Sequence, residues 1–381
     1  MTPRHRATLI AFVAVAGAAV WLWRTDTFSR AIEAAQLVAG LAAGESGGSA
    51  MLPARTTVTY AVAGRTHGAD VYPAAGEANA KARAALILVA GAIATGKDDP
   101  RLVALAHTLA KARFEVFVPD LPRVRELKLS SADALDVADA VQHLAASSPA
   151  PERLGVVGVS YALGPVVLAA LDPAVGGKIA FIVGIGGYYD LDAVLAFFTT
   201  GYYRPAPGGP PAWRRPNDYG KWLFVLANVD WLSDSHDAAL LSSIARRRLD
   251  DPAADIADLR SGLGPEGRAV LAFAENKDLE RVPELFAGLP AGLRREVAAL
   301  DLKTKDLSHL APRFLLLHGR DDAIIPDGES VKLEAALPEG RADLFLLDRF
   351  AHVDVEKPDF ATAFTLWRAA LRLLELRDGA D

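Results

Sequence analysis

The chain has 381 residues, of which 51% are hydrophobic and 23% charged, so it can bury a substantial globular core. A formal net charge of −6 without a basic block argues against a nucleic-acid partner. The absence of cysteine excludes disulfides, thiol catalysis and cysteine-based zinc sites, and no other metal-ligand spacing occurs, so we expect no metal and no cofactor.

The first segment has the pattern of a membrane anchor. Arg4 and Arg6 precede an uncharged apolar run, Ala7–Trp23, that ends at Arg24. A helix of this length spans about 25 Å, close to the ~30 Å hydrocarbon core of a bilayer. We therefore expect residues 1–24 to form an uncleaved single-pass anchor, with the body of the protein outside the cytoplasm. A cleaved signal peptide, which would leave a secreted protein, and a buried soluble helix are the alternatives.

The next parts of the chain are a helix with a linker and then a strand–helix alternation. Residues 25–54 contain an alanine-rich helical pattern at 28–44 and a linker at Glu45–Ser49. Residues 55–190 predict strands at 55–63, 68–73, 84–89, 114–118, 154–157 and 178–185, with helices at 100–112, 130–146 and after 160. This alternation indicates an α/β fold with a mostly parallel, doubly wound sheet.

The alternation stops at Leu191 and resumes near residue 308. Residues 191–307 contain no convincing strand run and have a proline-rich crossing at Arg204–Pro216. Their helical patterns lie at 190–198, 218–232, 237–248, 266–273 and 278–300. We expect a helical cap here, inserted into the sheet. Residues 308–381 then predict strands at 313–317 and 342–347 and helices at 329–337 and 360–374.

A serine lies at a predicted strand-to-helix turn. The segment Gly158-Val159-Ser160-Tyr161-Ala162 follows an apolar strand and precedes a run of small and apolar residues. Small residues on both sides let the strand and the helix approach closely, which exposes the serine hydroxyl as a nucleophile. Many similar pentapeptides lie in ordinary loops, so the prediction depends on finding a general base and a carboxylate elsewhere in the chain.

The base and the acid are sought after the later strands. Of the eight histidines, His352 lies in a loop between the last strand and the last helix, where no packing pattern requires it. Asp322 follows the strand at 313–317, and its spacing to Pro326 favours it over Asp321. The alternative for either aspartate is a role in forming the turn. Asp190 is a weaker candidate for the triad acid, because its position fits the N-cap of the next helix better.

Serine, aspartate and histidine thus occur in that order, each directly after a predicted core strand. In this the chain resembles the α/β-hydrolase family, whose catalytic triad has the same order. The motifs that match are Gly158–Ala162, His318–Asp322 with Pro326, and Ala351-His352. The second glycine of the family's serine motif is alanine here. The resemblance covers residues 55–190 and 308–381, and the insertion lies where that family carries its lid.

The resemblance implies how the residues would act. Ser160 would attack a carboxylic ester, His352 would accept the serine proton, and Asp322 would orient His352. The backbone N–H groups of Tyr161 and Ala92 would stabilise the oxyanion. The expected partner is a small-molecule or lipid-like acyl substrate. Two alternatives stay open: a peptidase or amidase with the same triad, and a non-catalytic binding protein. Nothing in the sequence indicates an oligomeric state.

Two other features have competing interpretations. The loop Gly91–Asp98 follows a strand and matches a phosphate-binding pattern, but Asp98 stands where that pattern needs serine or threonine. Gly184–Gly187 lacks the third glycine position of a dinucleotide loop. The cap is rich in aromatic residues, which either pack it onto the core or line an acyl pocket; they are Phe197, Phe198, Tyr202, Tyr203, Trp213, Tyr219, Trp222 and Trp231.

Overall fold

The computed structural model describes residues 26–43, 54–75, 81–147, 152–348, 350–351, 354–355 and 359–380. The expected membrane segment, Ala7–Trp23, and the expected linker, Glu45–Ser49, lie outside these ranges. Among the helices within them, none combines the length and the apolar character needed to cross a membrane.

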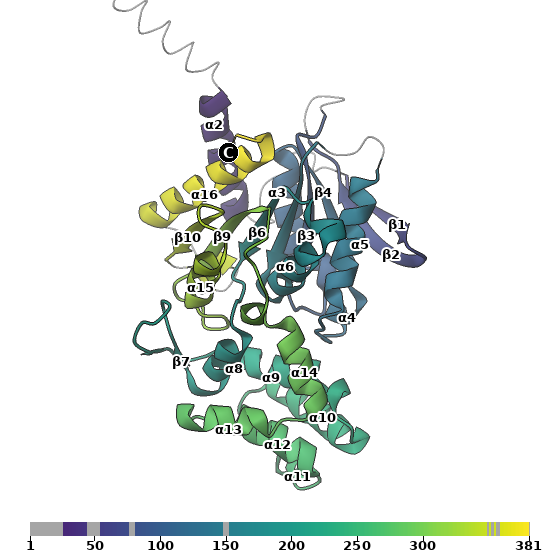
Figure 1. The fold of residues 1–381 in the computed structure, drawn as a ribbon, viewed down its shortest axis with the longest axis vertical. Coiled ribbons are helices and arrows are strands. Elements are labelled where there is room, and N and C mark those ends of the chain that lie inside the picture. The colour runs from purple at the N-terminus through teal and green to yellow at the C-terminus, as the bar shows by residue number, and fades with distance from the viewer. Residues whose placement is uncertain are drawn as a thin grey trace, which may run out of the picture.

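One large sheet organises the described residues (Figure 1). Its eight strands lie in the order β1 (Thr56–Val62), β2 (Arg65–Tyr72), β4 (Phe114–Pro119), β3 (Ala84–Val89), β5 (Leu154–Val159), β6 (Phe181–Ile185), β9 (Arg313–Gly319) and β10 (Ala342–Leu347). β1 and β2 form an antiparallel hairpin, β2 pairs antiparallel with β4, and β4, β3, β5, β6, β9 and β10 run parallel to one another. Every residue of β3 and β5 is buried, because helices cover both faces of the sheet.

Two helical layers enclose this sheet. One face packs against α5 (Asp133–Ala145), α6 (Leu163–Leu171) and α15 (Gly328–Ala336), and the other against α2 (Asp26–Ala43), α3 (Pro100–Lys111) and α16 (Phe360–Asp378). The short helical turns of the core are η2 (Gly96–Asp98), α4 (Pro122–Arg125), η3 (Ser160–Ala162) and α7 (Pro173–Gly176). Asp99 caps α3 by accepting from the N–H groups of Arg101 and Leu102.

Helix α2 is docked on α16 at the other end of the chain (Figure 1). Ala34 and Leu37 of α2 are buried. The indole Nε1 of Trp367 donates to the Ala31 carbonyl at 2.9 Å. The fully buried Arg377 pairs with Glu33 at 2.8 Å, so both apolar packing and charge hold the helix in place.

A cap of helices is inserted between β6 and β9 (Figure 1). Its elements are α8 (Leu191–Thr200), β7 (Tyr202–Tyr203), β8 (Ala212–Trp213), α9 (Asp218–Ala227), η4 (Val229–Trp231), α10 (Ser235–Asp250), α11 (Ala257–Arg260), α12 (Pro265–Ala274), η5 (Leu279–Arg281), α13 (Val282–Ala287), α14 (Ala291–Leu300) and η6 (Leu302–Thr304). The prediction of one helix over 278–300 is wrong. Pro290 precedes α14 in an extended conformation, and a proline disfavours helical backbone at the residue before it. The β7–β8 pair was also not expected.

Candidate active site

The turn that follows β5 holds Ser160 in a strained backbone conformation. Its φ angle is +53°, in the left-handed region that residues with a side chain rarely adopt. Gly158 makes the tight turn possible, because a Cβ at this position would lie 2.7 Å from the Leu163 Cα. A strained serine between a parallel strand and a helix is the geometry that presents a nucleophile at the end of a sheet.

The loop after β3 passes beside this serine. A Cβ at Gly91 would lie 3.1 Å from the Val159 carbonyl oxygen and 3.3 Å from the Ser160 Cβ, so glycine allows the close approach. Ala92, the next residue in the loop, lines the same cavity as Ser160 and Tyr161. The two residues expected to supply oxyanion N–H groups therefore border the cavity that contains the predicted nucleophile.

The Asp322 carboxylate is fully buried just beyond the end of β9. Its Oδ1 accepts from the backbone N–H groups of Ile324 at 2.8 Å and Ile325 at 3.0 Å. Its Oδ2 lies 3.4 Å from the Nε2 of His318. Asp321, in contrast, is exposed. A buried and oriented carboxylate suits the acid of a triad better than an exposed one, which supports Asp322.

Two other candidates have structural roles. His318 is fully buried, and its Nε2 lies 2.8 Å from the Ile325 carbonyl oxygen, so the ring braces the loop that holds Asp322. Asp190 caps α8, because its Oδ1 accepts from the Ala193 N–H at 3.1 Å. Its Oδ2 also pairs with Lys303 at 2.8 Å. Both carboxylate oxygens of Asp190 are therefore engaged in holding the start of the cap.

The predicted general base, His352, lies outside the described residues. The short strands β11 (Phe350–Ala351) and β12 (Asp354–Val355) form an antiparallel pair. They follow β10, whose last residue, Leu347, pairs with Gly319 at the end of β9. The chain therefore leaves the sheet for β11 at the same edge as it leaves for Asp322.

A cavity of about 1090 Å³ contains Ser160 and extends between the core and the cap. It is as large as the largest common small-molecule sites. Its wall is mostly aliphatic, with Leu105, Leu195, Leu223, Leu249, Val297, Leu317 and Leu366 among its residues. Of the eight cap aromatics, Phe198 and Tyr219 line the cavity, Phe197 and Trp222 are buried, Tyr203 is half-buried, and Tyr202, Trp213 and Trp231 are exposed. The aromatic residues thus divide between lining, packing and the surface.

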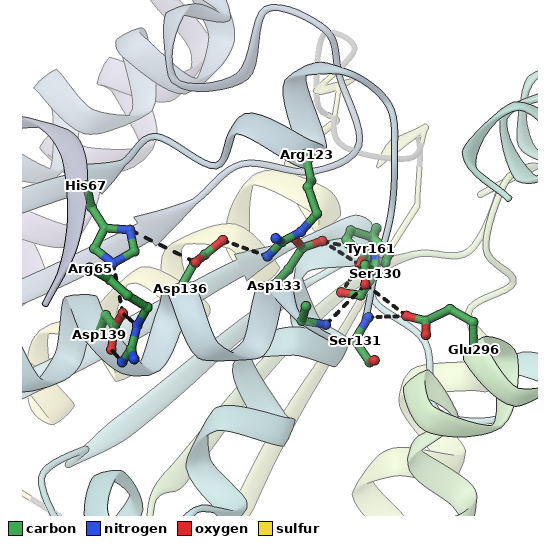
Figure 2. A network of polar contacts seen from close by, with 11 residues as sticks. Arg65, His67, Arg123, Ser130, Ser131, Asp133, Asp136, Asp139, Tyr161 and Glu296 are labelled. Carbon is green, nitrogen blue, oxygen red and sulfur yellow. Dashed lines mark hydrogen bonds and ion pairs between the residues drawn. The ribbon is translucent and has the colours of Figure 1, made fainter. Parts of the chain in front are cut away.

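The side chain of Tyr161 is held in a buried polar network that the sequence did not indicate (Figure 2). Its hydroxyl lies 2.9 Å from the Ser130 carbonyl oxygen and 2.9 Å from Asp133 Oδ2. Arg123 donates to Asp133 Oδ1 at 2.9 Å. Burial raises the pKa of the Tyr161 hydroxyl well above its usual range, so this hydroxyl remains a donor at neutral pH. Burial also raises the pKa of Asp133, although its hydrogen bonds oppose that effect.

The lysine of the Gly91–Asp98 loop forms an internal ion pair. Lys97 Nζ lies 2.8 Å from Oδ2 of the buried Asp70, which also accepts from Arg55 at 2.6 Å. The residue that a phosphate loop would present to a ligand thus ties this loop to β2. Over the described ranges, no three histidine, aspartate or glutamate side chains are grouped as a metal site requires.

Among comparisons with known proteins, only those with solved structures find matches, and they show what fold this chain has. No protein-family model matches the chain, and no curated protein matches it by sequence. The rice cell wall degrading esterase LipA from Xanthomonas oryzae matches 88% of this chain and 93% of its own, with a TM-score of 0.53 and 15% identity. A meta-cleavage product hydrolase from Pseudomonas fluorescens matches 83% of this chain and 96% of its own, with a TM-score of 0.42 and 17% identity. The esterase shares this chain's fold over nearly its whole length.

Proposed function

We propose that this chain, which has the α/β-hydrolase fold expected from its sequence, is a serine hydrolase that cleaves a carboxylic ester. One observation carries the proposal: Ser160 has a positive φ at the turn after β5 and lies on a large apolar cavity. Strain of this kind costs folding free energy and clusters at active sites, and among the described non-glycine residues with a positive φ only Ser160 carries a nucleophilic side chain. Fold likeness alone would not support an activity, since one fold hosts many functions.

In this mechanism Ser160 Oγ attacks the ester carbonyl carbon while His352 accepts the hydroxyl proton. The buried Asp322 carboxylate orients the histidine and stabilises its charged form. The N–H groups of Tyr161 and Ala92 stabilise the oxyanion. The C–O bond to the alcohol then breaks, and the alcohol leaves with the proton from His352. Water, activated by the same histidine, releases the acid and restores the serine.

The cavity supports an apolar acyl group as the part of the substrate that is recognised. Its aliphatic wall gains from burying hydrocarbon, at about 0.8 kcal/mol for each methylene removed from water. A volume near 1090 Å³ leaves room for a long chain. We therefore propose esters with medium or long acyl chains as the substrate class. We also propose that Ala7–Trp23 anchors the protein in a membrane, where such esters are concentrated.

A fluorophosphonate probe and an ester panel test the function. The wild-type protein is expected to form one covalent adduct, at Ser160, and to hydrolyse p-nitrophenyl esters faster as the acyl chain lengthens from two carbons. Ser160→Ala is expected to lose the adduct and to slow turnover by about 10⁴-fold or more. Full ester turnover by Ser160→Ala would exclude this function. A wild-type protein that cleaves only amides would favour the peptidase alternative, and one without an adduct would favour a binding protein.

A further inference from the structure

Three side chains of the cap each contact one of the segments proposed to carry out the chemistry. They are Tyr219 of α9, Arg214 just before α9, and Glu296 of α14. Each makes a hydrogen bond to the core. The core partners are the Ala92 carbonyl, the Asp322 carbonyl and the Ser130 hydroxyl, which lie in three different loops. We name these three residues the cap clamp. A lid that only covered a pocket would not need polar contacts at all three places.

Tyr219 contacts the loop after β3, which carries the proposed oxyanion donor Ala92. Its hydroxyl donates to the Ala92 carbonyl oxygen at 2.9 Å. Fixing this carbonyl fixes the peptide plane that follows Ala92 and so limits how that residue can rotate. Burial raises the pKa of the Tyr219 hydroxyl, which keeps it protonated and able to donate. The ring also lines the cavity with Ser160, so the hydrogen bond is partly shielded from solvent.

Glu296 contacts the segment that holds Tyr161 (Figure 2). Its Oε1 accepts from the Ser131 N–H and, at 3.1 Å, from the Ser130 hydroxyl. The Ser130 carbonyl in turn accepts from the Tyr161 hydroxyl at 2.9 Å. Glu296 is 6% exposed, so these charge-assisted bonds are formed largely away from water and are stronger for it. The cap is thereby linked to Tyr161, the residue after the proposed nucleophile, through the segment Ser130-Ser131.

Arg214 contacts the loop after β9, which carries the proposed triad acid Asp322. Its Nη1 donates to the Asp322 carbonyl oxygen at 2.6 Å. Its guanidinium is itself fixed, since Nη2 donates to the Tyr203 hydroxyl at 2.7 Å and the guanidinium carbon lies 4.7 Å from the centre of that ring. Beside it, the Asn217 N–H donates to the Ala323 carbonyl at 2.7 Å. The two peptide groups that flank Ala323, Asp322–Ala323 and Ala323–Ile324, are therefore both held from the cap.

Resting on the proposed function, we propose that the cap clamp positions the catalytic groups, so that the cap is part of the catalytic machinery and not only a cover. Tyr219 positions the residue whose backbone N–H is one proposed oxyanion donor, Ala92. Glu296 positions the residue that supplies the other N–H, Tyr161. Arg214 positions the proposed triad acid, Asp322. None of the three touches the reacting atoms. Each acts by narrowing the motion of a group that must meet the transition state in a fixed geometry.

Steady-state kinetics on a p-nitrophenyl ester test this. Tyr219→Phe keeps the ring and removes one hydrogen bond, and we expect kcat to fall about fivefold. Glu296→Ala and Arg214→Met remove charge-assisted bonds, and we expect kcat to fall by about tenfold or more in each. KM should stay within about twofold, because the lost bonds are not made to substrate. Glu296→Gln keeps an acceptor oxygen, and Arg214→Lys keeps one donor, so both should recover part of the loss.

Matched controls come from the same cap. Tyr202→Phe, Glu284→Gln and Arg281→Met alter exposed side chains of the same types that lie outside the three contacts, and they should leave kcat unchanged. The clamp is refuted if its variants keep wild-type kcat, or if their kcat falls no more than that of the controls. It is also refuted if KM rises while kcat is constant, because that pattern indicates lost substrate binding.

Amide hydrogen exchange separates the clamp from the proposed function. Tyr219→Phe should speed exchange in a peptide covering 90–96, Glu296→Ala in one covering 129–134, and Arg214→Met in one covering 319–326. This readout needs no activity. A wild-type protein without a fluorophosphonate adduct would contradict the proposed hydrolase, while faster exchange in these peptides would still show that the cap holds the loops. Unchanged exchange in all three would overturn the clamp even in an active enzyme.

Discussion

The backbone of Ser160 carries the strain of the candidate site. A residue with a Cβ in the left-handed region costs roughly 1–2 kcal/mol, and Ser160 adopts it at φ +53°. Two glycines make this position possible, since Gly158 admits the helix and Gly91 admits the neighbouring loop. The strain is therefore local, and it should be measurable as a stability difference between small substitutions at this one position.

We expect Ser160→Gly to be more stable than Ser160→Ala by about 1 kcal/mol, because glycine adopts a positive φ without a steric penalty. Urea unfolding of the two variants measures this. Position 162 is the matched control: its φ is −64°, so Ala162→Gly should lower stability, by up to about 1 kcal/mol. A Ser160→Gly protein less stable than Ser160→Ala would show that this turn is not strained.

Some of the candidate residues were predictable and others were not. Ser160 and Asp322 follow buried strands, so their positions at one edge of the sheet follow from the strand pattern and the parallel topology. The partners of Tyr161 were not predictable, because Ser130 and Asp133 approach it only after the sheet and helix α5 have formed. A hydrogen bond between residues this far apart leaves no periodic trace in the sequence.

At the scale of elements, the buried Asp70 joins the hairpin of β1 and β2 to the loop after β3. Burial acts to raise the pKa of Asp70, but hydrogen bonds from Lys97, Thr57 and Arg55 outweigh it and leave the pKa below its ordinary value. A lowered folded-state pKa means that the charged form stabilises the fold. This stabilisation is present above the unfolded pKa, near 4, and is lost as the pH falls through the folded-state value.

Asp70→Asn should therefore lower the free energy of unfolding at pH 7, by about 2 kcal/mol, since it removes the counter-charge of the largely buried Lys97 and of the more exposed Arg55. The deficit relative to wild type should shrink as the pH falls below about 4, because the carboxylate of the unfolded wild-type chain then takes up a proton, which favours unfolding. Denaturant titrations at several pH values measure both. Glu280→Gln, at an exposed position, should show no such trend. A deficit that grows in acid would contradict the assigned direction.

Helix α2 is an element whose existence was expected but whose docking was not. Its helical pattern is visible in the sequence, yet its partners in α16 lie at the opposite end of the chain. We expect Leu37→Ala to destabilise the protein by about 2–3 kcal/mol, because the Leu37 side chain is 5% exposed. Gln36→Ala, on the exposed side of the helix, should cost less than about 0.5 kcal/mol. Equal thermal melts for the two variants would mean that α2 does not stabilise the core.

At the scale of the molecule, the sheet was more predictable than the cap. The strands of the core are short apolar runs bounded by turns, and their order follows from a few rules of connection. The cap helices lie on one another and on the core without a sheet to set their direction. Their boundaries depend on local breaks such as Pro290, and the clamp contacts depend on how the whole cap is seated.

The docking of α2 on α16 also determines when the molecule can finish folding (Figure 1). The helix at 26–43 is synthesised long before its partner at 360–378. At 5–20 residues per second, the ribosome needs roughly 20–70 s to make the chain between them. Throughout that time Ala34 and Leu37 lack their final cover. The nascent chain therefore exposes these apolar side chains to aggregation until α16 emerges, and termination before residue 360 removes the partner that would cover them.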